Sequence, residues 1–136
     1  MIDIDPVDAA VQYLKADTDL DSLVDGQIAA KHRYGEGWER DTNGLAVHLD
    51  GGLPELYVPM QKVRLEMRCY GPTTVEATKI WRQLVEMSRN DERVEITMAN
   101  GDRALGYHFL QDSGPSLLYD RDLDMDFMMA FFQLTM

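Results

Sequence analysis

Apolar residues recur at helical spacing in two segments of the chain. The first begins at Asp5-Pro6, where the Asp side chain can cap free N–H groups and the Pro presets the first helical φ. Apolar positions then follow at i, i+3, i+4 and i+7, which predicts an amphipathic helix to Ala16, with a further turn over 18–25. The second begins at Thr73, which forms a capping-box pattern with Glu76, and it extends to about Arg89. Its apolar stripe predicts that this helix lies on a sheet.

Alternating apolar and polar residues predict the strands. The strictest alternation runs over 62–70, where apolar side chains on one face oppose Lys62, Arg64, Glu66 and Arg68 on the other. Shorter runs predict strands at 45–49 and 27–33. The pattern around Asn100-Gly101 predicts a hairpin of 92–99 and 102–111 joined by a type I′ turn.

Two loops and a last strand complete the predicted order of elements. Residues 34–43 contain two Gly, no periodicity and an isolated Trp38, which predicts a long loop. Gly114-Pro115 predicts another loop through Arg121. The last strand, 123–134, is apolar on both faces in its second half, so we expect helices on one side and a second layer or another subunit on the other.

Length and composition exclude several classes of protein. A chain of 136 residues is one ordinary domain, 1–136, and its single Cys excludes an intrachain disulfide framework. The net charge of −11 argues against a DNA reader, because nucleic-acid affinity depends on Lys and Arg neutralising phosphates. No apolar run approaches the ~20 residues that span a bilayer, and the acidic start does not resemble a signal peptide, so we expect a cytoplasm-like location.

The titratable residues do not form a motif typical of catalysis or metal binding. The three His and Cys69 lack zinc-ligand spacing. The alternating Asp runs that start at Asp17 and Asp120 lack the Gly and Glu that an EF-hand loop requires at its sixth and twelfth positions. Nucleophile, dinucleotide and phosphate-loop motifs are also missing from the sequence. We therefore expect no enzymatic activity, no cofactor and no metal.

The distribution of charged, Met and Trp residues leaves alternatives open. Seven of the 13 basic residues fall in 61–93, which indicates either a polarised surface that joins like subunits or a solvated face. The nine Met are explained either by adaptable core filling or by a contact surface that repacks. Trp38 either packs locally or docks onto a partner.

The order of these elements resembles a known family. The resemblance is carried by a strand ending Arg68-Cys-Tyr-Gly71, a helix beginning Thr-Thr-x-Glu-Ala77, a hairpin, Ser113-Gly-Pro-Ser116 and a strand ending Phe131-Phe-Gln-Leu134. In these features the chain resembles the tail-terminator, or tail completion, proteins of long-tailed bacteriophages. The resemblance extends over nearly the whole chain.

The resemblance implies both a fold and a function. The implied fold is α+β, a mostly antiparallel mixed sheet with two main helices packed on one face. The implied function is structural: a hexameric ring caps the head-proximal end of the tail tube, ends tube polymerisation and provides the surface that joins tail to head. Its implied partners are copies of itself, the tail tube protein and the head completion or connector protein. DNA would pass through the ring without specific binding.

Contact residues follow from this resemblance as expectations only. They lie in the loop with Trp38, on the polar face of the strand 61–70 and in the segment 113–126; the candidates are Trp38, Lys62, Arg64, Glu66, Arg68, Ser116, Tyr119, Asp120, Asp122, Asp124 and Asp126. Two alternatives remain at the level of sequence. One is another head-to-tail connector or stopper ring, and the other is a small cytosolic ligand-binding or hydrolytic α+β domain.

Overall fold

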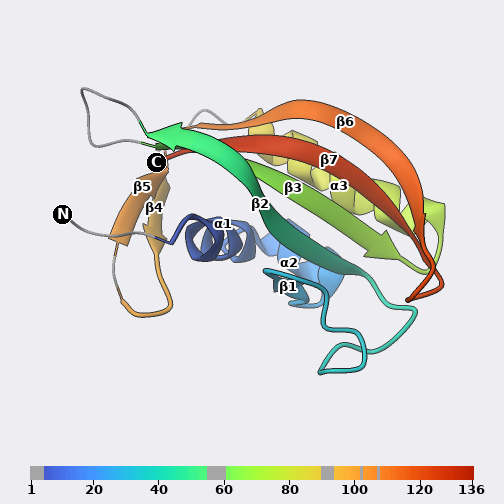
Figure 1. Cartoon of the computed structure of the whole chain (residues 1–136). Helices are drawn as coiled ribbons and strands as arrows, with labels where there is room; N and C mark the ends of the chain where they lie inside the picture. The colour runs from blue at the N-terminus through green and yellow to red at the C-terminus, as the bar shows by residue number, and fades with distance from the viewer. Residues whose placement is uncertain (1–4, 55–60, 90–93, 102, 107) are drawn as a thin grey trace.

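The computed structural model describes residues 5–54, 61–89, 94–101, 103–106 and 108–136. Its main sheet has five strands in the order β1-β2-β3-β7-β6 (Figure 1). The strands are β1 (Ile28–Ala29), β2 (Gly44–Pro54), β3 (Gln61–Gly71), β6 (His108–Asp120) and β7 (Met125–Thr135). β1 is parallel to β2, and every other pairing in this sheet is antiparallel. The prediction of a mostly antiparallel mixed sheet in an α+β fold is confirmed.

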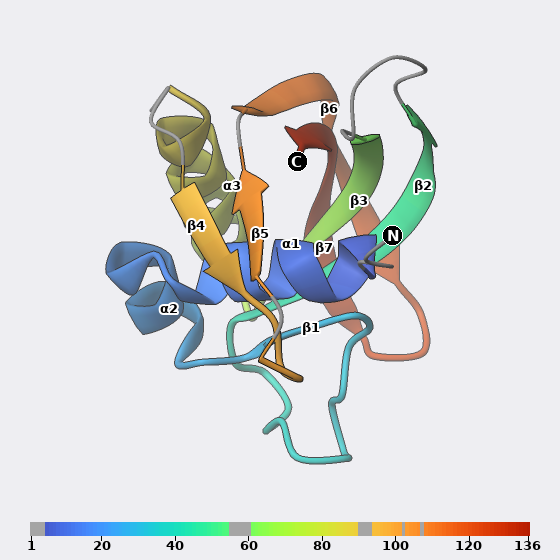
Figure 2. The ribbon, with the colours of Figure 1, turned by 90° about the vertical axis from the view of Figure 1, so that its left-hand side faces the viewer.

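Three helices lie on one side of this sheet: α1 (Pro6–Lys15), α2 (Thr18–Val24) and α3 (Thr74–Ser88) (Figure 2). The α1 helix packs against β2, while α3 covers β3, β7 and β6. The predicted caps are present, since Asp5 accepts a hydrogen bond from the Val7 amide at 3.0 Å and Thr73 accepts one from the Glu76 amide at 3.3 Å. The turn predicted over 18–25 is a separate helix, because Asp17 provides α2 with a cap of its own.

The main core lies between the helices and the sheet. Alternate residues of β3 and β7 point into it, and Leu65 pairs in register with Phe132. Both are fully buried, as are Ile80 and Leu84 of α3. Phe132 also stacks on Phe109 of β6 with a ring-centroid distance of 4.9 Å. Burying a side chain of this size contributes about 1.5–3 kcal/mol, so this layer provides most of the stability of the fold.

The prediction of a loop over 113–121 is wrong. Residues 113–120 belong to β6, which pairs with β7 from His108 to Asp120 and contains Gly114-Pro115 in its middle. Proline normally interrupts a strand because it lacks an N–H. The ladder accommodates it here with register shifts on both sides of Ser113, and β6 lies at the edge of the sheet, where a missing donor is tolerated.

Two turns also differ from the predictions. The hairpin near Asn100 pairs only β4 (Val94–Thr97) with β5 (Arg103–Gly106), in a separate two-stranded sheet. Its connection is longer than two residues and has Gly101, not Asn100, in the left-handed region. The last strand begins at Met125 and not at Leu123, because Asp124 adopts a φ of 52° in the turn after β6.

Candidate interaction surface

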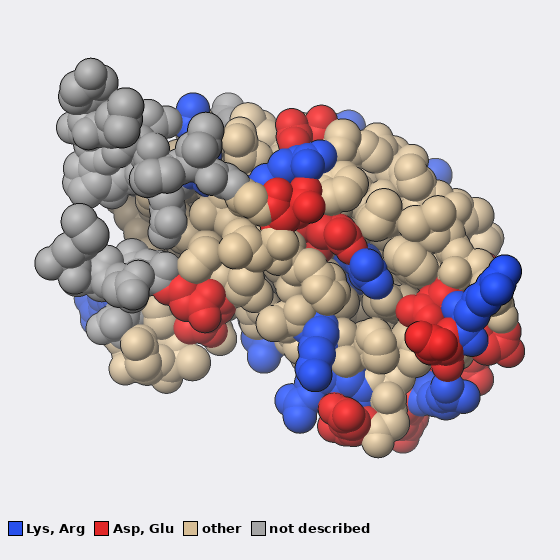
Figure 3. All heavy atoms as spheres, in the orientation of Figure 1, with Lys and Arg blue, Asp and Glu red and all other residues tan. Residues whose placement is uncertain are grey.

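The face of the sheet opposite the helices, called here the outer face, carries the predicted charged row of β3. Arg64, Glu66 and Arg68 point to this face and are partly buried. The strand register sets Glu66 beside Phe131 and Arg68 beside Met129 of β7. In Figure 3, acidic and basic side chains alternate across the middle of this face, and mostly uncharged side chains surround them. The row itself has a net charge of +1, which the neighbouring carboxylates of Asp50 and Asp112 offset.

Arg64 connects four strands of the outer face. Its guanidinium donates hydrogen bonds to Asp50 of β2 at 2.5 Å and to Asp112 of β6 at 2.7 Å, and it contacts the Ser113 hydroxyl at 3.3 Å. The same group lies 4.2 Å from the ring centroid of Phe131 on β7. An Arg that bridges two carboxylates and also stacks on a ring is more restrained than one in a single surface ion pair. Its charge is therefore largely matched within the chain.

Arg68 is also matched within the chain. It pairs with Glu66 and lies 5.4 Å from the ring centroid of Phe127. His48 of β2 lies beside this pair, and burial, followed by the Arg68 charge, lowers the pKa of its imidazole. Arg64 and Arg68 thus already have partners inside the chain, and the pairing of this row with a neighbouring subunit stays a prediction.

The loop with Trp38 covers one end of the outer face. Tyr34 is buried there with Tyr70 and Phe127, and its hydroxyl donates to the Thr42 carbonyl at 2.8 Å. Trp38 packs edge-to-face on Tyr34 with a centroid distance of 5.2 Å and is partly buried. Of the two sequence interpretations of Trp38, local packing is therefore the one found. The second layer predicted over the last strand is, at this end, the chain's own loop.

Gly44 permits this packing. A Cβ atom at this position would lie 2.5 Å from the Tyr34 hydroxyl and 2.9 Å from the Trp38 ring. The start of β2 therefore approaches the two rings more closely than any larger residue allows.

The predicted acidic candidates gather around the turn between β6 and β7. Asp120 accepts hydrogen bonds from the amides of Asp122 and Leu123 at 3.0 and 3.2 Å. Asp124 accepts one from the Tyr119 hydroxyl. The carbonyl of Asp122 accepts one from Arg40 of the Trp38 loop at 3.2 Å. These groups therefore shape the turn and hold the loop against it.

The remaining candidates lie apart from one another. Asp126 is opposite Tyr119 on the helix side of the sheet, whereas Ser116 is on the exposed β6. Lys62 lies near the other end of β3 and is exposed. The candidates on β3 thus form one group, and those in the turn between β6 and β7 form another. The structure does not join all the candidates into one site.

Sequence reasoning named Tyr119 but missed the other exposed apolar residues of β6. Four of its large apolar side chains are between 40% and 53% exposed: Leu110, Leu117, Leu118 and Tyr119. Leu117 and Tyr119 lie on the helix side of the sheet and Leu118 on the outer face. The signal was three consecutive apolar residues shortly after Pro115. It was overlooked because the Gly-Pro pair indicated a loop.

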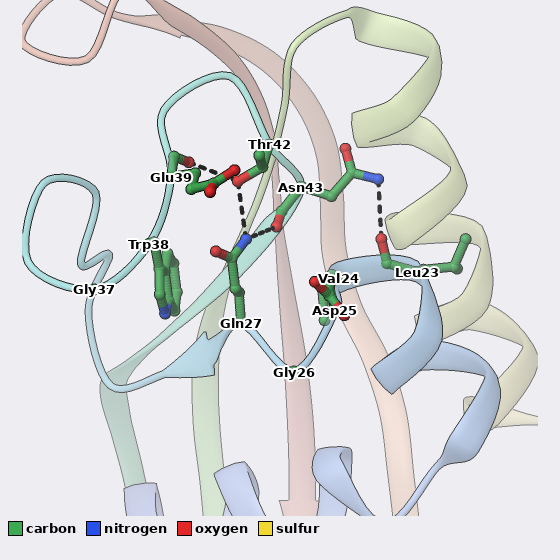
Figure 4. A pocket seen from close by; sticks show the side chains of 10 residues that line it. All are labelled: Leu23, Val24, Asp25, Gly26, Gln27, Gly37, Trp38, Glu39, Thr42 and Asn43. Carbon is green, nitrogen blue, oxygen red and sulfur yellow. Dashed lines mark hydrogen bonds between the residues drawn. The ribbon is translucent and has the colours of Figure 1, made fainter.

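Two cavities lie beside β1 and β2. The larger, about 570 Å³, is enclosed by the end of α2 and the Trp38 loop, with Trp38 on one side (Figure 4). Gln27 crosses it to donate to the Thr42 hydroxyl at 3.0 Å, and Asn43 donates to the Leu23 carbonyl at 3.0 Å. The smaller, about 400 Å³, lies between α1 and β2 and is lined by Asp5, Val7, Asp8, Val11, Ala30, Val47, His48 and Leu49.

Within the described ranges, the structure gathers no three His, Cys, Asp or Glu residues that could hold a metal ion. The helices of that same part of the chain are all too short or too polar to cross a membrane. No model of a known protein family matches the sequence, and no curated protein matches it.

Proposed function

We propose that this chain is a tail terminator of a long-tailed bacteriophage. In this role it forms a hexameric ring on the head-proximal end of the tail tube, ends tube polymerisation and provides the surface that joins tail to head. It acts by assembly and not by catalysis. Its partners are copies of itself, the tail tube protein and the head completion or connector protein. It belongs to the head–tail junction of the virion and to the host cytoplasm during assembly.

The observation that carries this proposal is the exposed apolar character of β6. An edge strand presents unpaired backbone groups, and proteins that remain single usually protect such edges with charges or a covering segment. β6 has Pro115 and register shifts in its middle, yet on both sides of them it exposes apolar side chains: Leu110, Leu117, Leu118 and Tyr119. Exposed apolar side chains concentrated on one edge are typical of a surface that another protein covers. An assembly protein has a use for such an edge, whereas an isolated domain does not.

The charge of the chain supports the same role. On the outer face, Arg64 and Arg68 contribute little free positive charge, because both are matched by carboxylates of their own chain. The net charge of −11 therefore remains available to repel phosphates. A ring through which a duplex passes benefits from this repulsion, since the DNA does not adhere to the lumen.

A second role in the same junction, as a stopper or other connector ring, is the nearest alternative. We expect a stopper to be closer to an all-β barrel, and the three helices that cover one face of the sheet favour the terminator. The two roles differ in the structure they bind, because a terminator binds the end of the tail tube and a stopper binds the head connector.

The cavity beside Trp38 favours one candidate of a different class, a small cytosolic ligand-binding or hydrolytic domain. Its volume of about 570 Å³ is within the range of small-molecule sites, and an indole forms one wall. Thermal-shift screening of the purified protein against a metabolite library tests this role. A compound that raises the melting temperature of the wild type but not of Trp38→Ala would favour the ligand-binding domain over the terminator.

Electron microscopy tests the terminator directly. The purified chain is imaged alone and mixed with tail tubes of the phage that encodes it. We expect rings at one end of the tubes and tubes that no longer elongate when tube protein is added. Tubes that remain bare and continue to grow at saturating protein would contradict the proposal.

A further inference from the structure

The sheet has two open edges of different character. β6 forms one edge, and in the described part of the chain it pairs with β7 alone. At the other side β1 pairs with β2 only at Leu45 and Ala46, so the described residues leave the rest of β2 without a neighbour on that side. Each edge could accept a strand from another chain.

The strand directions make these two edges compatible. β2 is antiparallel to β3, β3 to β7, and β7 to β6, so β6 runs opposite to β2. All copies in a cyclic ring keep the same direction relative to the ring axis. The β2 strand of one copy would therefore meet β6 of the next in antiparallel orientation, which is the pairing found between β2, β3, β7 and β6.

The side chains beside the two edges also match. The smaller cavity follows β2 on the helix side of the sheet and is largely apolar, and Leu49 at its rim is 54% exposed. On the helix side of β6, Leu117 and Tyr119 are exposed. In a continuous sheet the helix sides of neighbouring strands lie together, so these two side chains would face the cavity of the next copy.

The helices beside the two edges differ in charge. Residues 5–15, which form α1 and its N-cap next to β2, contain two Asp and one Lys, a net charge of −1. Residues 74–89, which form α3 and its C-terminal cap beside β6, contain three basic residues and two Glu, a net charge of +1. A contact between unlike edges brings these opposite net charges together, whereas a two-fold contact between like edges would not.

From these features we propose that the occupant of the β6 edge is a second copy of this chain, whose β2 edge adds to β6 and whose α1–β2 cavity receives Leu117 and Tyr119. This inference rests on the proposed ring and identifies the contact between its subunits. The contact is heterologous, because it joins two different surfaces of the chain. Repeated around an axis it uses both edges of every subunit.

Cysteine crosslinking tests this contact. The double variant Leu49→Cys/Leu117→Cys places one thiol at each edge, and a flexible bifunctional maleimide tolerates the stagger between neighbouring tilted strands. The native Cys69 is buried, and burial raises the pKa of its thiol, so it does not compete under native conditions. We expect the concentrated protein, alone or on tail tubes, to give covalent species up to the hexamer on a denaturing gel.

Matched controls separate the possible outcomes. The control is the double variant Leu49→Cys/Val75→Cys, in which the second thiol replaces a 62% exposed residue of α3. It should not give the ladder of crosslinked species up to the hexamer. Either single variant should give no species larger than a dimer, and a strong dimer from Leu117→Cys alone would overturn the contact in favour of like-edge pairing. Rings in the microscope without a ladder would overturn the strand pairing alone. Wild-type tubes without rings would overturn both the contact and the terminator.

A charge substitution gives an independent readout. Leu49→Glu adds a carboxylate to the β2 edge at an exposed position, so the melting temperature should stay near that of the wild type while rings on tubes are lost. Val75→Glu adds the same charge at the exposed start of α3, on neither edge strand, and should retain the rings. Rings formed equally by both variants would overturn the proposed contact.

Discussion

At the scale of single residues, Arg64 makes the clearest energetic contribution on the outer face. Its guanidinium joins Asp50, Asp112 and the ring of Phe131. We expect Arg64→Gln to reduce the free energy of unfolding by about 1 kcal/mol, a value that allows for solvent screening of partly exposed charges. Arg89→Gln is the control, since Arg89, the C-cap residue of α3, forms an exposed ion pair with Glu86 of that helix. Urea denaturation should show a clear loss for the first variant and almost none for the second.

His48 should make stability depend on pH. Its folded pKa is lowered, first by burial and then by Arg68, so below its ordinary value of 6.5 the unfolded chain binds the proton more readily. The stability is therefore fully present above that value and is lost as pH falls through the folded pKa.

Urea midpoints at about pH 7.5 and about pH 5.5 measure this effect, because most carboxylates stay ionised over that range. We expect the midpoint of the wild type to fall, and that of His48→Gln to fall less. His108→Gln, which changes an exposed residue of β6, should behave as the wild type. A wild-type midpoint that is constant over this range would contradict the assignment.

At the scale of elements, prediction succeeded where a local pattern and the tertiary environment agree. The alternation over 62–70 identified β3 because its two faces meet different surroundings, and the caps at Asp5 and Thr73 identified α1 and α3. It failed at β6, where Gly114-Pro115 has the local signature of a turn. Pairing with β7 overrides that signature, and such long-range pairing is not visible in a single stretch of sequence.

Gly114 is the residue that allows β6 to pass Pro115. Its φ is 99°, and a Cβ atom would lie 2.9 Å from the Ala130 Cα atom of β7. We expect Gly114→Ala to reduce the free energy of unfolding by about 2–4 kcal/mol, since it adds a backbone clash to left-handed strain. Thermal unfolding followed by circular dichroism measures the loss.

Gly101→Ala is the matched control for this variant. Gly101 has a similar φ of 94°, but a Cβ atom added there would meet none of the described residues beyond its chain neighbours within 4 Å. Only the left-handed strain of about 1–2 kcal/mol therefore applies. If the two variants were equally destabilised, the close approach of β6 to β7 would have no energetic role.

At the scale of the whole molecule, the sequence predicted the composition of the surface but not its organisation. It identified the row of Arg64, Glu66 and Arg68, yet the partners of these residues come largely from β2, β6 and β7, which are distant in the chain. It also identified Trp38, whose contact with Tyr34 depends on a loop that closes back on itself. Such pairings are decided by tertiary contacts, so spacing along the chain could suggest the residues but not their roles.

The net charge of −11 leads to a prediction for the whole molecule: the protein does not bind duplex DNA at physiological salt. Binding requires a group of basic side chains free to neutralise phosphates, and Arg64 and Arg68 are instead held by carboxylates of the same chain. A gel mobility shift with submicromolar protein in about 150 mM salt should show free DNA only. The double variant Asp50→Asn/Asp112→Asn, which releases Arg64, is the sensitive comparison and should bind at most weakly at low salt. A shift by the wild type at physiological salt would mean that the surface carries an unmatched basic patch, and the repulsive lumen proposed for the ring would have to be abandoned.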